Sequence, residues 1–327
     1  MNARAVRIRE AGGPEVLELG EITIRPPGPH EVRVAVRAAG LNRADCLQRR
    51  GVYPAPKGIV PDVPGLEYAG EIEVCGEAVT ELEVGQRVMG IVAGGGMATH
   101  LVVHARECVP VPKSMSFEDA AAIPEAFFTA YDALVLQGGM VSGDHVLIHA
   151  AGSGVGTAAI QIARALGGRT MGTSRTAEKL SRCSELGLDH ELLVTEGTFA
   201  KRVRGLGGAD LILDTIGAKY LSDNIASLRA GGRIVVIGLL GGIKGELNLG
   251  QLLGKRGTIH GSVLRSRPLE EKIALAQLFA KRVLPLFERG ALRPVIDTVM
   301  DMNGVQAAHT KMEAGKTFGK IVLRWNE

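Results

Sequence analysis

The chain has 327 residues, with 46% hydrophobic and 22% charged side chains and a formal net charge of +3. These values are typical of a globular protein with two domains, and the charge is too small to indicate a nucleic-acid partner. The four cysteines, Cys46, Cys75, Cys108 and Cys183, are isolated along the chain. This pattern favours reduced thiols in a cytoplasmic protein over a disulfide framework.

The first 123 residues are predicted to be rich in β-strands. Side chains alternate with period two over residues 32–36, 71–74 and 86–90, and turns rich in Pro and Gly separate these stretches. After Ser116 the pattern becomes helical toward Leu136, with Pro124 as the predicted break.

From residue 146 onward, apolar strands alternate with helices. This order predicts an α/β domain with a doubly wound parallel sheet that is covered by helices on both faces. An amphipathic helix after Arg265 and a last strand at 319–323 complete the chain. The predicted strands are 146–150, 170–173, 210–214, 233–238 and 258–262, and the predicted helices are 157–166, 177–186 and 224–228.

One long uncharged run, residues 146–163, is the only candidate for a membrane span. It contains three glycines, which a continuous helix tolerates poorly, whereas a strand, a turn and a helix accommodate them. We therefore expect no transmembrane segment.

The same run predicts a dinucleotide-binding loop. Glycines allow the backbone to approach a pyrophosphate, and the start of the following helix offers unpaired N–H groups to the anion. An ordinary strand-to-helix turn is the alternative, but the further strand–helix units argue against it. His149, at the end of the strand, is predicted to be structural. The predicted cofactor-binding residues of the loop are Ala151, Gly152, Ser153, Gly154, Val155 and Gly156.

The end of the next strand favours NADPH over NADH. An NAD-binding domain usually carries an acidic residue about 20 positions after the glycines. Here the strand ends in Ser174 and Arg175, and Lys179 follows one turn later, so a 2′-phosphate would meet one hydroxyl and two cations. The alternative is that Arg175 and Lys179 are solvated surface charges.

Two segments of the first domain, Gly40-Leu41-Asn42-Arg43-Ala44-Asp45 and residues 63–70, resemble the medium-chain dehydrogenase/reductase superfamily. In its zinc alcohol dehydrogenases, a Cys and a His at two of these places bind the catalytic metal, whereas this chain has Asn42 and Leu66. A leucine cannot bind zinc and an amide binds it poorly, and the scattered cysteines leave no four-cysteine structural site. We therefore expect a zinc-free member with no metal-binding residues.

Within the superfamily, the chain resembles the quinone oxidoreductases over nearly its whole length, and in particular the group of the tumour-suppressor-inducible quinone oxidoreductase. The motifs that carry this resemblance include Asn42-Arg43-Ala44-Asp45, Ile123-Pro124-Glu125-Ala126, Gly154-Val155-Gly156, Gly238-Leu239, Leu264-Arg265-Ser266-Arg267 and Gly319-Lys320-Ile321-Val322-Leu323.

The resemblance implies a GroES-like catalytic domain, residues 1–123 and 265–327, and a Rossmann NADP-binding domain, residues 124–264. Cofactor and substrate would lie in the cleft between the domains, and the protein would be a homodimer. One departure weakens the 2′-phosphate site, because the family's tyrosine in the third-strand region is Leu193 or Val194 here.

The resemblance also assigns roles to single residues. Asn42 and Tyr53 would line the substrate site beside the nicotinamide, although Asn42 could instead cap a turn and Tyr53 could be a packing residue. Cys46 is predicted to be a bystander, since no His or Lys is evidently paired with it. The remaining residues implied to contact the cofactor are Thr129, Gly238, Leu239, Leu264 and Gly319.

The absent metal determines the predicted chemistry. Alcohol oxidation needs a Lewis acid to stabilise an alkoxide, whereas a quinone is already electrophilic and needs only orientation and hydrogen-bond donors. We expect Asn42 and Tyr53 to be these donors. The predicted function is the transfer of hydride, or of single electrons, from NADPH to quinones. A 2-enal or enone reductase is the alternative within the superfamily, and a zeta-crystallin-like RNA-binding or structural protein is the alternative of another class.

Overall fold

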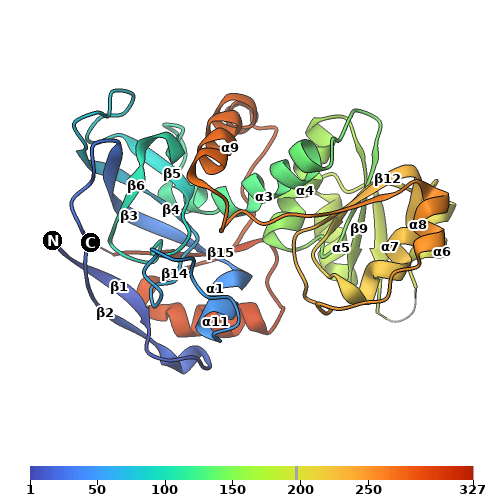
Figure 1. The fold of residues 1–327 in the computed structure, drawn as a ribbon, viewed down its shortest axis with the longest axis horizontal. Helices are drawn as coiled ribbons and strands as arrows, with labels where there is room; N and C mark the ends of the chain where they lie inside the picture. Colours follow the sequence, from blue (N-terminus) through green and yellow to red (C-terminus); the bar gives the residue numbers. More distant parts are fainter. Residues whose placement is uncertain (196–197, 327) are drawn as a thin grey trace. The chain divides into compact units, whose positions relative to one another are not determined.

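The structure is a computed structural model that describes residues 1–195 and 198–326. The chain forms two compact units (Figure 1). Unit 1 contains residues 1–128 together with the chain from Leu264 onward, and unit 2 contains residues 129–263. None of the described helices is long and apolar enough to cross a membrane.

Unit 1 is built on a seven-stranded sheet with the order β14-β15-β3-β4-β5-β7, in which β6 also pairs with β3. The predicted strands at 32–36 and 71–74 lie inside β3 and β4, and the third forms β5. The alternation has the expected cause, because Val32, Val34 and Val36 are all buried on one face of β3. The strands are β3 (Glu31–Leu41), β4 (Glu67–Cys75), β5 (Arg87–Ile91), β6 (His100–His104), β7 (Val109–Pro110), β14 (Ile296–Asp301) and β15 (Lys320–Arg324).

Helix α2 of unit 1 begins and ends where local chemistry predicts. The Ser116 hydroxyl accepts a hydrogen bond from the Asp119 N–H at 3.0 Å and caps α2, which ends before Pro124. The predicted amphipathic helix is α9, where the buried Phe279 packs against Phe128 with ring centroids 4.1 Å apart. The helices are α1 (Arg43–Arg49), α2 (Phe117–Ala121), the π-helical η3 (Pro124–Phe128), α9 (Leu269–Arg282), α10 (Leu284–Glu288) and α11 (Val305–Glu313), and β1 (Asn2–Ile8) and β2 (Leu17–Thr23) form a separate antiparallel pair.

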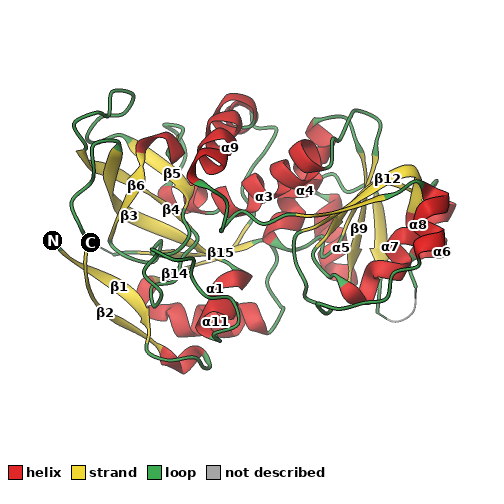
Figure 2. Ribbon diagram, in the orientation of Figure 1, coloured by secondary structure: helices red, strands yellow, loops and turns green. Residues whose placement is uncertain are grey.

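Unit 2 has a six-stranded sheet with the order β10-β9-β8-β11-β12-β13, and every pairing in it is parallel. Helices lie on both faces of this sheet (Figure 2). The doubly wound α/β prediction is therefore confirmed. The strands are β8 (His145–Ile148), β9 (Arg169–Ser174), β10 (His190–Leu193), β11 (Ala209–Asp214), β12 (Leu228–Val236) and β13 (Thr258–Gly261), and the helices are α3 (Thr129–Tyr131), η4 (Asp132–Gln137), α4 (Gly154–Ala165), α5 (Ala177–Ser184), α6 (Ala200–Gly205), α7 (Leu221–Ser227) and α8 (Leu249–Lys255).

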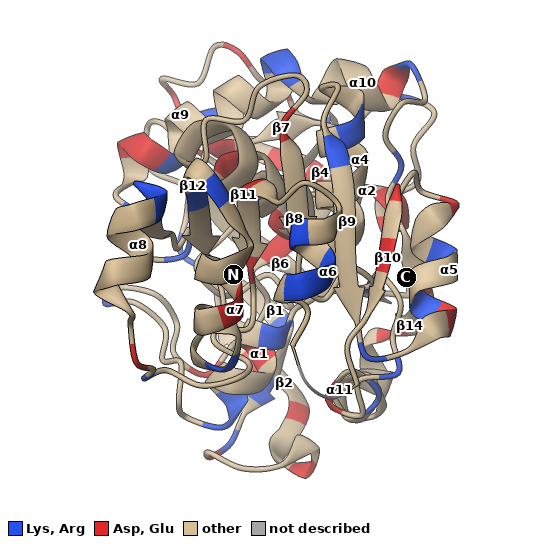
Figure 3. Cartoon of the chain, turned by 90° about the vertical axis from the view of Figure 1, so that its right-hand side faces the viewer, with Lys and Arg blue, Asp and Glu red and all other residues tan. Residues whose placement is uncertain are grey.

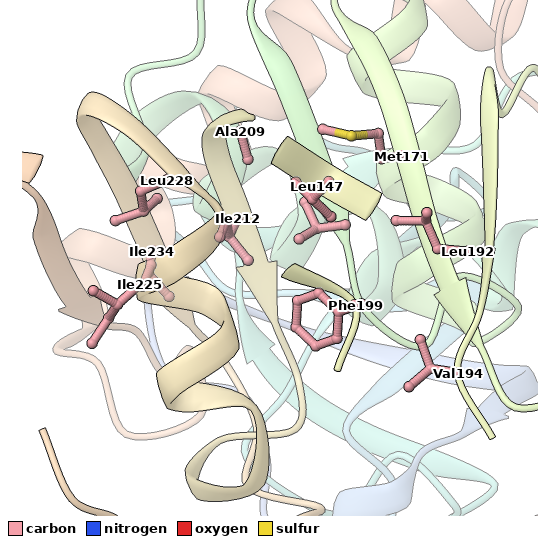
Figure 4. Packing of buried hydrophobic residues seen from close by; sticks show 11 residues of the cluster. Leu147, Met171, Leu192, Val194, Phe199, Ala209, Ile212, Ile225, Leu228 and Ile234 are labelled. Atoms are coloured by element: carbon pink, nitrogen blue, oxygen red, sulfur yellow. The ribbon is translucent and has the colours of Figure 1, made fainter. Parts of the chain in front are cut away.

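Both faces of the central strands are buried. Leu147 of β8, Ile212 of β11 and Ile234 of β12 pack around Phe199 on one face (Figure 4). Their neighbours along β8 and β11 point to the other face and are equally buried, which explains why these strands appear in the sequence as continuous apolar runs. The predicted strand 146–150 ends earlier, at Ile148, because Ala150 adopts a left-handed conformation with φ 49° and starts the turn.

Candidate active site

The predicted phosphate loop connects β8 to α4. Ser153 caps α4, since its Oγ accepts a hydrogen bond from the Gly156 N–H at 3.0 Å. A side chain at Gly156 would place its Cβ 2.5 Å from the carbonyl oxygens of Ala150 and Ala151, so only glycine allows this close approach.

The loop has the donors that a pyrophosphate requires. Within the described ranges, the backbone N–H groups of Gly152, Gly154 and Val155 have no hydrogen-bond partner. Unpaired N–H groups at the start of a 12-residue helix, in a turn without bulky side chains, fit the phosphates of a dinucleotide. The residues of this loop would hold the pyrophosphate.

The other predicted contacts of unit 2 are distributed around the same edge of the sheet. Ser174 ends β9 and Gly238 follows β12, and the carboxyl ends of parallel strands share one edge with the loop after β8. Leu239 is 51% exposed. Thr129 starts α3 and is half-buried, and Lys179 is half-buried within α5.

The end of β9 combines a hydroxyl with an exposed cation. Arg175 is exposed and forms no ion pair within residues 1–195 and 198–326. Leu193, one of the two residues that could stand at the place of the family's tyrosine, pairs with Ser174 in the β9–β10 register and is 40% exposed. Leu193 therefore offers apolar surface, not a hydroxyl, beside Ser174.

His149 belongs to a buried hydrogen-bond chain under the loop. Its Nδ1 lies 2.9 Å from the Thr173 hydroxyl and its Nε2 lies 2.6 Å from the Asn224 Oδ1. The Asn224 amide donates to Asp214, which also accepts backbone N–H groups at the end of β11. Burial lowers the pKa of His149, so the ring is neutral and links the ends of three strands. These contacts agree with the structural role predicted for it.

In unit 1, Asn42 belongs to a buried polar cluster. Lys320 on β15 donates to the Asn42 Oδ1 at 2.6 Å, to the Glu67 Oε1 at 2.5 Å and to the Leu41 carbonyl at 3.1 Å. The Asn42 Nδ2 donates to the same Glu67 oxygen at 2.8 Å and to the Gly40 carbonyl at 3.3 Å. The amide is therefore held in one orientation, with both of its N–H groups engaged.

Two more carboxyl groups lie in this cluster. Asp45 on α1 accepts the N–H groups of Asn42 at 2.8 Å and Gly65 at 2.9 Å, and burial raises its pKa to about 6. The Glu125 backbone N–H donates to the second oxygen of Glu67 at 2.8 Å. Burial, and then the charge of Glu67, raise the pKa of the Glu125 carboxyl to about 8.

Tyr53 is held by an arginine that follows a predicted site residue, the buried Leu264. The Arg265 guanidinium lies 5.0 Å from the centre of the Tyr53 ring and donates to the Tyr53 carbonyl at 3.1 Å. Its other bonds reach the Ala93 carbonyl at 2.7 Å and the Gln48 Oε1 at 2.5 Å. Within the described chain the Tyr53 hydroxyl has no hydrogen-bond partner, so it is free to donate to a ligand.

Cys46 has a histidine neighbour that sequence reasoning missed. Its Sγ lies 3.5 Å from the His309 Nδ1, and His309 also lies 3.2 Å from the Arg49 guanidinium. Burial raises the pKa of the thiol to about 12, and burial next to Arg49 lowers the pKa of His309 to about 3. The pair is therefore a neutral thiol and a neutral ring, which is not the charge state of an activated nucleophile.

The positions at which zinc relatives carry their ligands hold no comparable donors. Leu66 is buried, and the Asn42 amide is bonded to an ammonium and a carboxylate. Among the residues that the structure describes, no three His, Cys, Asp or Glu side chains are grouped so that they could hold a metal ion.

Gly319, another predicted cofactor contact, has φ 84°, and a Cβ there would lie 2.2 Å from the Val295 carbonyl oxygen. The packing of the backbone is therefore sufficient to require glycine at this position.

Comparison with known proteins agrees with both halves of the fold. Residues 28–113 match the family described as the alcohol dehydrogenase GroES-like domain, and residues 154–281 match the family described as zinc-binding dehydrogenase. A quinone oxidoreductase from Homo sapiens is 33% identical over 326 residues, which cover 98% of this chain and 97% of that protein.

Solved structures give the same result. A quinone oxidoreductase from Pseudomonas syringae pv. Tomato DC3000 matches with a TM-score of 0.89 and 30% identity over 98% of this chain and 99% of that one. The CurK enoyl reductase matches with a TM-score of 0.88 and 27% identity over 99% of each chain. The chain therefore belongs to the medium-chain dehydrogenase/reductase superfamily and is an oxidoreductase of the kind that uses a nicotinamide cofactor, with quinone oxidoreductases as full-length relatives.

Proposed function

We propose that this protein is a cytoplasmic, zinc-independent reductase that transfers hydride or single electrons from NADPH to quinones. The observation that carries the proposal is the Lys320 ammonium, which is bonded to Asn42 and Glu67 at the site where zinc relatives bind their metal. This arrangement supplies an internal ion pair in place of a Lewis acid. The four free cysteines are consistent with a reducing compartment.

The chain's own groups then have separate tasks. The loop from Ala151 to Gly156 binds the pyrophosphate through its backbone N–H groups, and the bound nicotinamide supplies the hydride. Tyr53, fixed by Arg265, donates a hydrogen bond to a carbonyl oxygen of the acceptor. Asn42 positions this part of the site through Lys320 and Glu67, since both of its N–H groups are already engaged.

The direct test is a turnover assay with a panel of ortho- and para-quinones and the purified protein. We expect oxidation of NADPH with at least one of them, and addition of a zinc chelator should leave the rate unchanged. Oxygen uptake during turnover separates single-electron transfer from hydride transfer. If no quinone is reduced, the proposal is wrong.

We further propose that the cofactor is NADPH and not NADH. Arg175 and Ser174 at the end of β9, with Lys179 on α5, would contact the 2′-phosphate. The exposed guanidinium of Arg175, without an ion pair in the described chain, supports this assignment. Calorimetric titration of Arg175→Ala should show weaker NADPH binding with unchanged NADH binding. An equal loss for both nucleotides would contradict it.

Reduction of 2-enals or enones is a second candidate, because the CurK enoyl reductase has the same fold over the full chain. In that reaction, hydride adds to the β-carbon and a proton adds to the α-carbon, so a donor-lined site without metal serves both reactions. Side-by-side kcat/KM values for crotonaldehyde-like enals and naphthoquinones decide between the two.

The charge distribution supports a small-molecule substrate over a nucleic acid. Helix α5 carries both signs of charge, with Glu178 next to Lys179 in its first turn and Arg182 in its last turn, and Figure 3 shows both signs on this helix. A nucleic-acid site needs a continuous basic surface, which this helix does not provide. Gel retardation with AU-rich RNA, with and without NADPH, tests the RNA-binding alternative, and we expect no shift.

We also propose a homodimer that forms through unit 2. Strand β13 is the edge of its sheet, and Ile243, Leu249 and Leu253, in the segment between β12 and β13, are 76%, 68% and 79% exposed. An open edge strand next to exposed apolar side chains is typical of a protein interface. Light scattering should give the dimer mass for the wild type, and Leu253→Glu should reduce it to the monomer mass. A monomeric wild type would rule out this proposal.

A further inference from the structure

Three carboxyl groups of unit 1 share one buried ammonium. Asp45, Glu67 and Glu125 come from three different segments, and Lys320 is the ammonium that contacts this cluster directly. The Lys320 side chain is 5% exposed and that of Glu67 is fully buried. Three negative charges around one directly bonded ammonium, with Arg265 as the next cation, are energetically unfavourable, which favours a proton on one of these groups.

Hydrogen-bond counting identifies which group holds it. Both oxygens of Glu67 accept bonds, from Asn42 and Lys320 on one side and from the Glu125 N–H on the other. Both oxygens of Asp45 accept backbone N–H groups. The groups around these four oxygens are all donors, so neither carboxyl has an acceptor for a proton of its own.

The Glu125 carboxyl differs from the other two. In the described part of the chain its oxygens accept no hydrogen bond from any side chain or backbone group. The residue as a whole is only partly buried, so part of it is accessible to solvent or a ligand. The raised pKa of Glu125, about 8, agrees with a carboxyl that is neutral at pH 7.

The charged and titratable groups around Glu125 come from every segment near it. Glu67 on β4 and Asp45 on α1 favour the protonated form, whereas Lys320 on β15 and Arg265 favour the ionised form. Tyr53 lies within electrostatic range, since the charge of Glu125 contributes to raising the pKa of the Tyr53 phenol. The Glu125 carboxyl is thus electrostatically coupled to the residue that we expect to orient the substrate carbonyl.

We propose that Glu125 is the proton donor of the reduction, an inference that rests on the function proposed above. Hydride brings both electrons to the quinone. The O–H bond of the Glu125 carboxyl then breaks while an O–H bond forms on the substrate oxygen, and the carboxylate regains its proton from water. The transfer is favourable, because a phenolic oxygen has a pKa of about 10 and is therefore more basic than this carboxylate.

The test compares Glu125→Gln with Glu83→Gln, which removes an exposed carboxyl of the same unit. Infrared difference spectra of proteins with labelled glutamate should show a protonated carboxyl at pH 7 in the wild type and in Glu83→Gln. The band should disappear in Glu125→Gln. This measurement needs no cofactor and no substrate.

Kinetics provide the second readout. For the wild type, kcat with quinone should fall as the pH rises through about 8, and Glu125→Gln should lower kcat about 10²-fold with little change in KM. The variant should also lose the pH dependence and the solvent isotope effect on kcat. Glu125→Asp, which keeps the acid, should retain both and provides the test if the glutamine variant folds poorly.

The outcomes separate this inference from the proposed function. If the wild type reduces no quinone but shows the carboxyl band, the proposed function fails and the protonation state of Glu125 stands. If the wild type reduces quinones while Glu125→Gln keeps its kcat and pH profile, Glu125 is not the proton donor. A wild type without the band at pH 7 overturns the inference as well.

Discussion

Replacing Lys320 by Met tests the ion pair that stands where zinc relatives hold their metal. Methionine keeps most of the apolar stem and removes only the ammonium with its three hydrogen bonds. Loss of one member of a buried ion pair costs about 3–5 kcal/mol, because the other charge remains buried. Glu67 would still accept bonds from Asn42 and the Glu125 N–H, so we expect about 3 kcal/mol, the lower end of that range.

Urea unfolding followed by tryptophan fluorescence measures this loss. Trp325 is the only tryptophan of the chain and lies in unit 1, so its signal reports the unit that contains the mutation. The double variant Glu67→Gln/Lys320→Met also removes the carboxylate that would remain unpaired, so it should recover most of the stability that Lys320→Met loses. A buried carboxyl without a cation is less destabilising in its neutral form than in its ionised form, and low pH favours the neutral form. The single variant should therefore lose less stability at pH 5 than at pH 8.

Two results would refute this reasoning. If the single variant lost less than about 1 kcal/mol in free energy of unfolding, the ion pair would contribute no more than a pair at the surface does. Additive effects of the two single substitutions in a double-mutant cycle would mean that Lys320 and Glu67 are not coupled, whatever the distance between them.

Further predictions concern the loop, the tyrosine clamp, the pH profile and the buried thiol. Gly156→Ala should weaken NADPH binding at least tenfold in calorimetry, because its Cβ would collide with two carbonyl oxygens of the turn, whereas unchanged binding would show that the loop tolerates the side chain. Arg265→Met should raise KM for quinones more than it lowers kcat, since it releases Tyr53; a change confined to kcat would contradict a positioning role. The folded-state pKa of Glu125 lies above its unfolded value, so the wild-type melting temperature should fall as the pH rises from 4.5 to 8, and Glu125→Gln should flatten that slope; the same slope in both proteins would assign it to other groups. Cys46, whose pKa is raised to about 12, should resist thiol reagents in the folded protein, and rapid labelling without unfolding would show that the thiol is accessible.

Two of the strands that sequence reasoning missed share a physical cause. Strands β10 and β14 both lie at the edge of their sheets, where one side has no neighbouring strand. Strand β10 (His190-Glu191-Leu192-Leu193) has one buried residue and β14 has none, so neither a buried alternation nor an apolar run marks them. Central strands such as β8 and β11 are buried on both faces, and their apolar runs were sufficient to predict them.

The candidate site was predictable only where its residues are close in sequence. The loop at 151–156 could be read directly, because the strand, the glycines and the helix follow one another. The pairing of Lys320 with Glu67 spans 253 positions and that of Cys46 with His309 spans 263, so spacing carries no signal for either. Pairing of β15 with β3 brings Lys320 to Asn42, and no pattern within the last strand predicts which strand will be its neighbour.

The Lys320 cluster also restricts which substrates suit the site. A zinc ion would leave positive charge available to an alkoxide, but the charge of Lys320 is already directed at Glu67 and at the Asn42 and Leu41 oxygens. An acceptor in this site therefore meets neutral donors, the Tyr53 hydroxyl and the proposed acid Glu125. Such donors cannot hold a simple alkoxide as an anion, but they can protonate an oxygen as weakly basic as that of a reduced quinone. In the proposed zinc-independent reaction, this ion pair thus makes a proton donor necessary.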